Sequence, residues 1–161
     1  MKPKLTFLLA LTFLFLLGSS SVVFGDEIQD GFDAYKKKDY KEAVKWYRLS
    51  AEQGYAGAKL NLGVMYGKGQ GVPQDNKEAV RLYRLSAEQG DAKAQSNLGN
   101  NYALGEGVPQ DYVSAHMWMN LSGSQGITNA VTNRNILEEE MSKQQIEKAQ
   151  EMARNWKPTS K

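Results

Sequence analysis

The sequence contains no cysteine and only one histidine in its 161 residues. The absence of cysteine excludes a disulfide framework, a thiolate zinc site and a cysteine nucleophile. The single histidine, His116, has no second histidine or thiolate with which to share a metal ion, so we expect a packed or half-buried ring. On these grounds we predict no metal site and no cofactor.

A net charge of one sign is also nearly absent. The formal charge is +2, and it comes from Lys2 and Lys4, because the first 25 residues contain no acidic side chain. The rest of the chain therefore carries 18 basic residues against 18 acidic ones. A balanced chain of this kind lacks the basic surface that attracts nucleic acid or acidic lipid. We predict no nucleic-acid partner.

Motifs that would carry chemistry are missing as well. The run from Gly67 to Gly71 (Gly-Lys-Gly-Gln-Gly) lacks the spacing of a phosphate-binding loop, and no strand precedes it as a dinucleotide-binding loop requires. No Ser-x-x-Lys sequence occurs. We expect the acidic residues 138–140 to form a solvated helix face rather than an acid–base pair. We therefore predict no catalytic residues and a protein that is not an enzyme.

Residues 1–25 have the three parts of a secretory signal. Two lysines form a basic start, an apolar run follows over residues 5–17, and small residues come next. We predict cleavage after Gly25 and a periplasmic or secreted mature protein with no stable membrane insertion. The alternative is an uncleaved membrane anchor, because residues 5–24 approach the roughly 20 residues that a spanning helix needs.

The clearest pattern in the chain is an internal repeat with a period of 36 residues. Residues 43–78 and 79–114 match without a gap at 22 of 36 positions, and a third copy begins at Ala115. Self-similarity at a fixed period of this length is the signature of an architecture in which identical supersecondary units stack.

Each period has the signals of two antiparallel helices. Asp39, Asp75 and Asp111 are each in place to cap a helix N-terminus, and a glutamate three residues after the first two predicts a capping box. Apolar residues follow at helical spacing and include Leu49 and Leu85. A glycine then ends this helix, and a Val-Pro pair stops the other helix of the period before the next cap.

The repeat carries a family resemblance. Its pattern, A-x-x-x-L-G-x-x-Y-x-x-G-x-G-V followed by the capping aspartate and a second helix, resembles the Sel-one-like repeat (SLR), a relative of the tetratricopeptide repeat (TPR). The match is close from Asp39 to Gly126. Paired loop glycines, such as Gly69 and Gly71, distinguish it from the shorter TPR unit. The resemblance implies an all-α fold, an α-α superhelix or solenoid of antiparallel helix pairs with about three repeats plus C-terminal capping helices.

On this basis the chain divides into five segments. Residues 1–25 are the predicted signal peptide, and residues 26–42 resemble an N-terminal capping helix of the TPR type. Residues 43–126 form the SLR units. Residues 127–157 are a degenerate C-terminal repeat with capping helices, and residues 158–161 are a tail. A polar terminal unit is expected because the last repeat has no neighbour to cover its outer face.

The resemblance also implies where a partner binds. In related repeats the first helix of each pair lines the concave face of the superhelix and holds extended peptides. The predicted binding residues on these helices are Lys59, Asn61, Met65, Lys68, Gln95, Asn97, Asn100 and Asn101. Asparagine side chains can donate to and accept from the main chain of a bound strand. An alternative role for Asn61 and Asn97 is hydrogen bonding between the repeat's own helices.

The function predicted from these observations is an exported, non-enzymatic scaffold that binds a protein or peptide partner. The sequence leaves two alternatives open. One is a cell-wall (peptidoglycan) binder or enzyme accessory, by analogy with cysteine-rich relatives whose cysteine pairs this chain lacks. The other is an assembly subunit whose exposed repeat end stacks on another solenoid, including a second copy of itself.

Overall fold

The computed structural model describes residues 26–159, so the predicted signal peptide lies outside the described part of the chain. Within that part all regular structure is helical and no strand occurs, which confirms the all-α prediction. The helices are α2 (Asp26–Lys36), α3 (Tyr40–Glu52), α4 (Ala56–Lys68), α5 (Asn76–Glu88), α6 (Ala92–Leu104), α7 (Tyr112–Ser124), α8 (Thr128–Glu138) and α9 (Lys143–Asn155).

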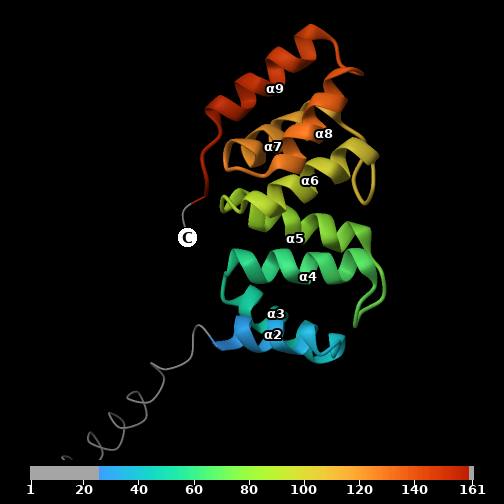
Figure 1. The fold of residues 1–161 in the computed structure, drawn as a ribbon, viewed down its shortest axis with the longest axis vertical. Helices are drawn as coiled ribbons and strands as arrows, with labels where there is room; N and C mark the ends of the chain where they lie inside the picture. The colour runs from blue at the N-terminus through green and yellow to red at the C-terminus, as the bar shows by residue number, and fades with distance from the viewer. Residues whose placement is uncertain (1–25, 160–161) are drawn as a thin grey trace, which may run out of the picture.

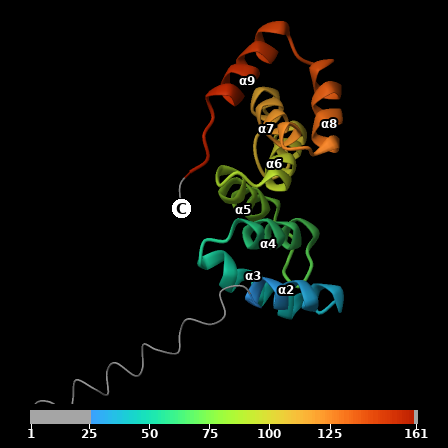
Figure 2. The ribbon, with the colours of Figure 1, turned by 60° about the vertical axis from the view of Figure 1, so that its left-hand side comes forward.

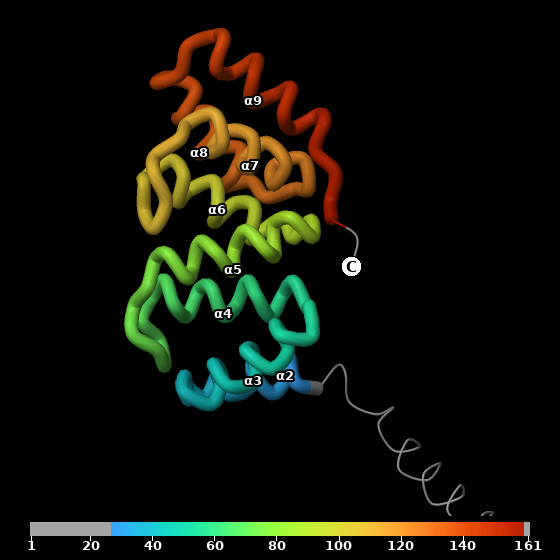
Figure 3. The backbone as a smooth tube through the Cα atoms, turned by 180° about the vertical axis from the view of Figure 1, so that it is seen from behind, coloured from blue at the N-terminus to red at the C-terminus, as the bar shows by residue number. Residues whose placement is uncertain are grey.

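The helices stack in chain order along the long axis of the molecule and form a short solenoid (Figure 1). Successive helices from α2 to α8 pack against one another in turn, whereas α9 packs against α7. Figure 2 shows α8 and α9 on opposite sides of α7. Seen from behind, the tube in Figure 3 follows the same order from α2 at one end to α9 at the other. The solenoid predicted from the repeat is therefore the observed architecture.

Aspartates begin the second helix of each repeat pair, as predicted. The side chains of Asp39, Asp75 and Asp111 all accept hydrogen bonds from backbone amides in the first turn that follows. At α5, Asp75 Oδ1 accepts from the amide of Glu78 at 3.0 Å. The predicted return bond from the glutamate is not formed there, because the Glu78 carboxylate accepts instead from Arg81 at 2.7 Å. The cap is confirmed, and the reciprocal half of the capping box is wrong at this helix.

The Gly-x-Gly-Val-Pro loop joins the two helices of one repeat, α4 to α5 or α6 to α7. Gly71 and Gly107 both have a φ of 73°, in the left-handed region that favours glycine. A Cβ atom at Gly107 would collide with the carbonyl oxygen of Asn76, the first residue of α5. A Cβ atom at Gly71 would collide in the same way with the carbonyl oxygen of Tyr40, the first residue of α3. Each loop therefore contacts the helix N-terminus of the preceding repeat.

The Leu-Gly pair of the repeat lets two helices approach closely. A Cβ atom at Gly63 of α4 would lie 2.8 Å from Cε1 of Tyr83 on α5. In the same way, a Cβ atom at Gly99 of α6 would lie 2.9 Å from Cγ of Met119 on α7. Both partner side chains are buried. The glycine thus leaves room for a core side chain from the following helix.

Buried serines directly follow partly exposed leucines in the second helix of each pair. Ser86 and Ser122 have no exposed area, and their hydroxyls donate to the backbone carbonyls of Ala56 and Ala92 on the preceding helix at 2.8 and 2.7 Å. Leu49 and Leu85 are 41% and 37% exposed. These leucines belong to the apolar spacing of the helix yet are partly exposed, because the helix is rotated so that the neighbouring serine faces the preceding helix.

The C-terminal unit follows its predicted pattern more closely. Ser142 and Gln145 form a full capping box at the start of α9. Ala149 and Ala153 are buried on one stripe of this helix. The ring of Trp156 continues the stripe and meets Trp118 of α7 edge-on, with 6.1 Å between ring centroids. The last helix therefore begins at a full capping box and packs one apolar stripe against α7.

Candidate functional site

Helix α4 presents different side chains on two opposite faces. Asn61 and Lys68 lie seven residues apart on one face, and Lys59 and Tyr66 lie seven residues apart on another. The two faces are about 200° apart, since each residue advances an α-helix by about 100°. The first face lines hollows shared with α6, and the second lines a groove shared with α3 and α5.

A groove that crosses α4, α6 and α8 is lined repeatedly by asparagine, and we name it the Asn groove. It consists of three adjoining hollows of ≈ 350, ≈ 400 and ≈ 510 Å³. Asn100 lines all three hollows, and Asn97 lines two of them. The asparagines of the groove are Asn61, Asn76, Asn97, Asn100, Asn101, Asn129 and Asn133.

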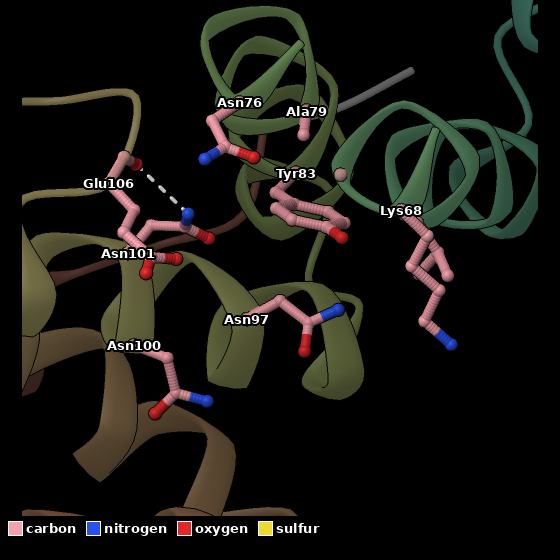
Figure 4. A pocket seen from close by; sticks show the side chains of 10 residues that line it. Lys68, Asn76, Ala79, Tyr83, Asn97, Asn100, Asn101 and Glu106 are labelled. Carbon is pink, nitrogen blue, oxygen red and sulfur yellow. Dashed lines mark hydrogen bonds between the residues drawn. The ribbon is translucent and has the colours of Figure 1, made fainter. Parts of the chain in front are cut away.

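Hydrogen bonding divides these asparagines into two kinds. Asn101 Nδ2 donates to the carbonyl of Glu106 at 2.9 Å (Figure 4), and Asn133 Nδ2 donates to Asn100 Oδ1 at 2.9 Å. The amides of Asn61 and Asn97 make no hydrogen bond within the described part of the chain. Their donors and acceptors are therefore available to a ligand, and hydrogen bonding between the repeat's own helices does not use them.

The first hollow has an aromatic floor. Tyr83 of α5 is only 7% exposed, and burial raises the pKa of its phenol to about 12, so the hydroxyl is neutral at physiological pH. Figure 4 shows the amides of Asn76, Asn97 and Asn101 around this ring. The hollow thus combines a neutral aromatic surface with amide groups that donate and accept.

The third hollow, between α6, α7 and α8, is the apolar end of the Asn groove. Leu104 and Ile136 line it and are 66% and 60% exposed, the highest values among the large hydrophobic side chains of residues 26–159. Tyr112 and Leu137 complete its wall. Burying an exposed leucine or isoleucine contributes about 1.5–3 kcal/mol, so this end suits an apolar side chain of a partner.

Charge is balanced around the Asn groove. Lys68 lies at the rim of the first hollow with Glu106, and Lys93 lines the second hollow. Glu140 lines the third. Because basic and acidic side chains alternate along the groove, amide hydrogen bonds and apolar contact are its main means of recognition rather than a field of one sign.

Three of the eight predicted binding residues lie elsewhere. Met65 and Gln95 have no exposed area. Met65 belongs to the core, one residue beyond the groove-facing position 64, and Gln95 donates to the carbonyl of Ala87 at 3.2 Å. Lys59 lies on the opposite face of α4, where its Nζ donates to the carbonyl of Gly54 at 3.1 Å. The residues that do line the groove are Asn61, Lys68, Asn97, Asn100 and Asn101.

Helix α8 supplies groove residues that the sequence prediction omitted. Asn129, Asn133 and Ile136 all line the Asn groove. Signals for all three were present, because they lie 36 residues after Lys93, Asn97 and Asn100, which also line the groove. The loss of the Leu-Gly pair made this segment resemble a terminal cap rather than a binding helix.

A second polar cluster joins α7 to α8. His116 has no exposed area, and its Nε2 lies 2.7 Å from Glu138 Oε1, while its Nδ1 has no partner among the described residues. The packed ring expected for His116 is therefore present. The expectation that all of residues 138–140 form a solvated face is wrong for Glu138, which is half-buried against the histidine.

Two negative findings concern residues 26–159. No group of three or more histidine, aspartate or glutamate side chains comes together there in a way that suits a metal ion. No helix in the same part of the chain combines the length and apolar character needed to cross a bilayer.

Comparison with known proteins identifies relatives of this fold. A sequence model of the Sel1 repeat matches residues 14–55, 56–91 and 92–127. The solved structure of a protective antigen from uropathogenic Escherichia coli strains, described as displaying an SLR fold, aligns over 86% of this chain with 30% sequence identity and a TM-score of 0.79. A Sel1 repeat protein from Oxalobacter formigenes aligns over 84% of the chain with 32% identity and a TM-score of 0.67.

A curated relative shares a shorter region. It is an exopolysaccharide production negative regulator from Rhizobium leguminosarum bv. viciae, and it is 46% identical over 50 residues, or 31% of this chain. The chain spans 19% of that regulator and 30% and 59% of the two solved proteins. The superhelical repeat fold predicted from the sequence is confirmed by the repeat match and by both structures.

Proposed function

The chain belongs to the Sel1 repeat family, whose members generally mediate protein–protein interactions, and we propose that it binds an extended peptide segment of a partner protein in the Asn groove. The observation that carries the proposal is the set of asparagines with unpaired amides on α4 and α6. An extended peptide presents backbone N–H and C=O groups along its length, and an asparagine amide can pair with both. Such pairing holds a main chain without requiring a particular sequence.

Selectivity in this proposal comes from the apolar end of the groove. The exposed side chains of Leu104 and Ile136 leave a hollow of ≈ 510 Å³ beside the amide-lined part. One large apolar side chain of the bound peptide fills it. Ordering the peptide offsets much of the gain from apolar burial and hydrogen bonding, so we expect an affinity on the order of micromolar.

The location and role follow from the sequence and the family. We propose that residues 1–25 direct export and that the mature chain acts outside the cytoplasm as a non-enzymatic scaffold, as members of this family typically do. Fusing residues 1–30 to a reporter that is active only outside the cytoplasm tests export. N-terminal sequencing of the exported chain should begin at Asp26. A reporter that stays inactive would overturn this part of the proposal without affecting the groove.

Selection of peptides from a displayed random library tests the binding proposal. The immobilised protein and a control variant, Asn155→Ala at the end of α9, should enrich the same peptides with an apolar residue at one position. The double variant Asn97→Ala/Asn100→Ala should lose at least tenfold in affinity for them. Circular dichroism checks that each variant is folded. Equal binding by the double variant, or enrichment of no peptide by any form, contradicts the proposed site.

A further inference from the structure

The C-terminal tail of the chain occupies a groove between α5 and α7, which we name the tail groove. The chain after α9 runs past α7 towards the end of α5 (Figures 1 and 2). Trp156 lies against Trp118, and the backbone amide and hydroxyl of Thr159 both donate to the carbonyl of Glu88, at 2.8 and 3.1 Å. Pro158 and Trp156 also lie beside Gly90. The occupant is thus a helix that ends in an aromatic residue and continues as an extended strand.

An equivalent groove exists one repeat earlier, between α3 and α5, and we name it the α3–α5 groove. It encloses ≈ 360 Å³. Six of its ten lining residues are identical to the residue 36 positions later, which lies in the tail groove. Among them are Leu62, Tyr66 and Leu85, whose counterparts in the tail groove pack in one cluster with Met152 and Trp156.

The walls of the two grooves have the same internal geometry. In the tail groove, Arg84 Nη2 donates to the hydroxyl of Tyr102 at 2.8 Å. In the α3–α5 groove, the corresponding Arg48 Nη2 donates to the hydroxyl of Tyr66 at 3.2 Å. The grooves therefore share their shape-determining contacts as well as most of their residues, because the repeat builds the same surface twice.

The tail groove and the α3–α5 groove differ in what covers them. Leu121 is half-buried in the tail groove, whereas its counterpart Leu85 is 37% exposed. Thr159 donates to the carbonyl of Glu88, but no described residue donates to the corresponding carbonyl of Glu52. The α3–α5 groove thus presents the apolar floor and the helix-end acceptor that the tail uses one repeat later.

We propose that the α3–α5 groove binds a segment of a partner protein with the chemistry of residues 152–159, namely a helix that ends in an aromatic side chain and continues as an extended strand. The aromatic ring packs on Leu82 and Leu85, and a backbone amide of the strand donates to the carbonyl of Glu52. A second copy of this chain is a weaker occupant, because the tail of that copy already lies in that copy's own tail groove. This surface lies on the face of α4 opposite the Asn groove and is independent of the function proposed there.

The rim of the α3–α5 groove is more polar than the rim of the tail groove. Arg81 and Glu78 replace Met117 and Ser114, and Arg81 donates to both carboxylate oxygens of Glu78 at 2.8 and 2.7 Å. This edge is therefore polar and internally paired. The bound helix faces it with polar side chains and turns its apolar stripe towards Leu85.

The test uses the chain's own segment as the probe. A labelled synthetic peptide of residues 143–159 is titrated into the full-length protein and binding is followed by fluorescence anisotropy. We expect saturable binding that weakens at least tenfold with Leu85→Glu, and at least tenfold when the peptide carries Trp156→Ala. The matched control Phe32→Glu, at an exposed apolar residue of α2 outside both grooves, should leave binding unchanged. Circular dichroism verifies the fold of each variant.

A second measurement locates the peptide without relying on lost affinity. Because the sequence has no cysteine, Leu85→Cys and Leu104→Cys each supply a single thiol for a peptide that carries a thiol-reactive group in place of Trp156. Cross-linking should occur at position 85 and not at 104. Three results overturn the proposal. The first is no saturable binding, and the second is binding that survives Leu85→Glu because the peptide exchanges with the chain's own tail. The third is a dimer, seen by light scattering, that Leu85→Glu dissociates.

Discussion

Replacing Gly107 by alanine measures how strongly the loop couples consecutive repeats. Gly105 and Gly107 lie in the same loop with φ values of 72° and 73°. Alanine in this left-handed region costs about 1–2 kcal/mol at either position. A Cβ atom at Gly105 would lie 3.4 Å from the Gln110 Cβ, an ordinary contact, whereas at Gly107 it would collide with the carbonyl of Asn76. Overpacking of this kind costs roughly a further 1–3 kcal/mol, because a backbone carbonyl, unlike a flexible side chain, cannot rotate away from the added Cβ atom.

We therefore expect Gly105→Ala to lower the free energy of unfolding by about 1–2 kcal/mol, and Gly107→Ala to lower it by about 2–5 kcal/mol. Urea unfolding followed by far-ultraviolet circular dichroism measures both. Gly71→Ala, which would meet the carbonyl of Tyr40 in the preceding repeat, should behave like Gly107→Ala. Equal losses for Gly105→Ala and Gly107→Ala would refute the argument that the loop is held against the preceding repeat.

Three further predictions concern buried polar groups. Ser86→Ala removes the hydrogen bond to the Ala56 carbonyl and should cost about 0.5–1.5 kcal/mol in urea unfolding, against less than about 0.5 kcal/mol for the exposed Ser124→Ala. Burial raises the pKa of Tyr83 to about 12. The contribution of the neutral phenol to the free energy of unfolding is therefore complete below the unfolded phenol pKa near 10 and is lost as pH rises from about 10 to 12. Tyr83→Phe should flatten this decline of stability with pH, and an unchanged decline contradicts the prediction. Glu138→Ala leaves the ring of His116 without a partner and should lower the free energy of unfolding by about 1–3 kcal/mol. The loss should be smaller in a His116→Val background. A double-mutant cycle that shows no coupling between the two positions would contradict the pairing.

The sequence predicted the helices and their boundaries from short-range signals. Capping aspartates and terminal glycines act on the residues next to them, so Asp75 and Asp111 identified helix starts correctly. The rotation of each helix about its axis was predicted less well. Leu85 and Ser86 are adjacent, and which of them faces inward depends on contacts with the preceding helix pair, which apolar spacing alone does not specify.

The candidate site was predicted in part for the same reason. Asn97 and Asn100 were identified because they occupy non-core positions of a recurring helix. Met65 and Gln95 were assigned to the same surface, yet they are buried, since one residue of helix turns a side chain by about 100° and moves it from groove to core. Ile136 lies 36 residues after Asn100 but was omitted, because the loss of the Leu-Gly pair made its segment resemble a terminal cap.

The sequence by itself determined the repeat, its period and the all-α class, because these depend on composition and spacing within 36 residues. Only the tertiary structure decided which face of each helix is open. The unpaired amides of Asn61 and Asn97 follow from the rotation of α4 and α6, which turns these side chains into the Asn groove. The contrast between a filled tail groove and an open α3–α5 groove follows from how α9 folds back onto α7. That contact joins segments distant in the chain, and no local pattern encodes it.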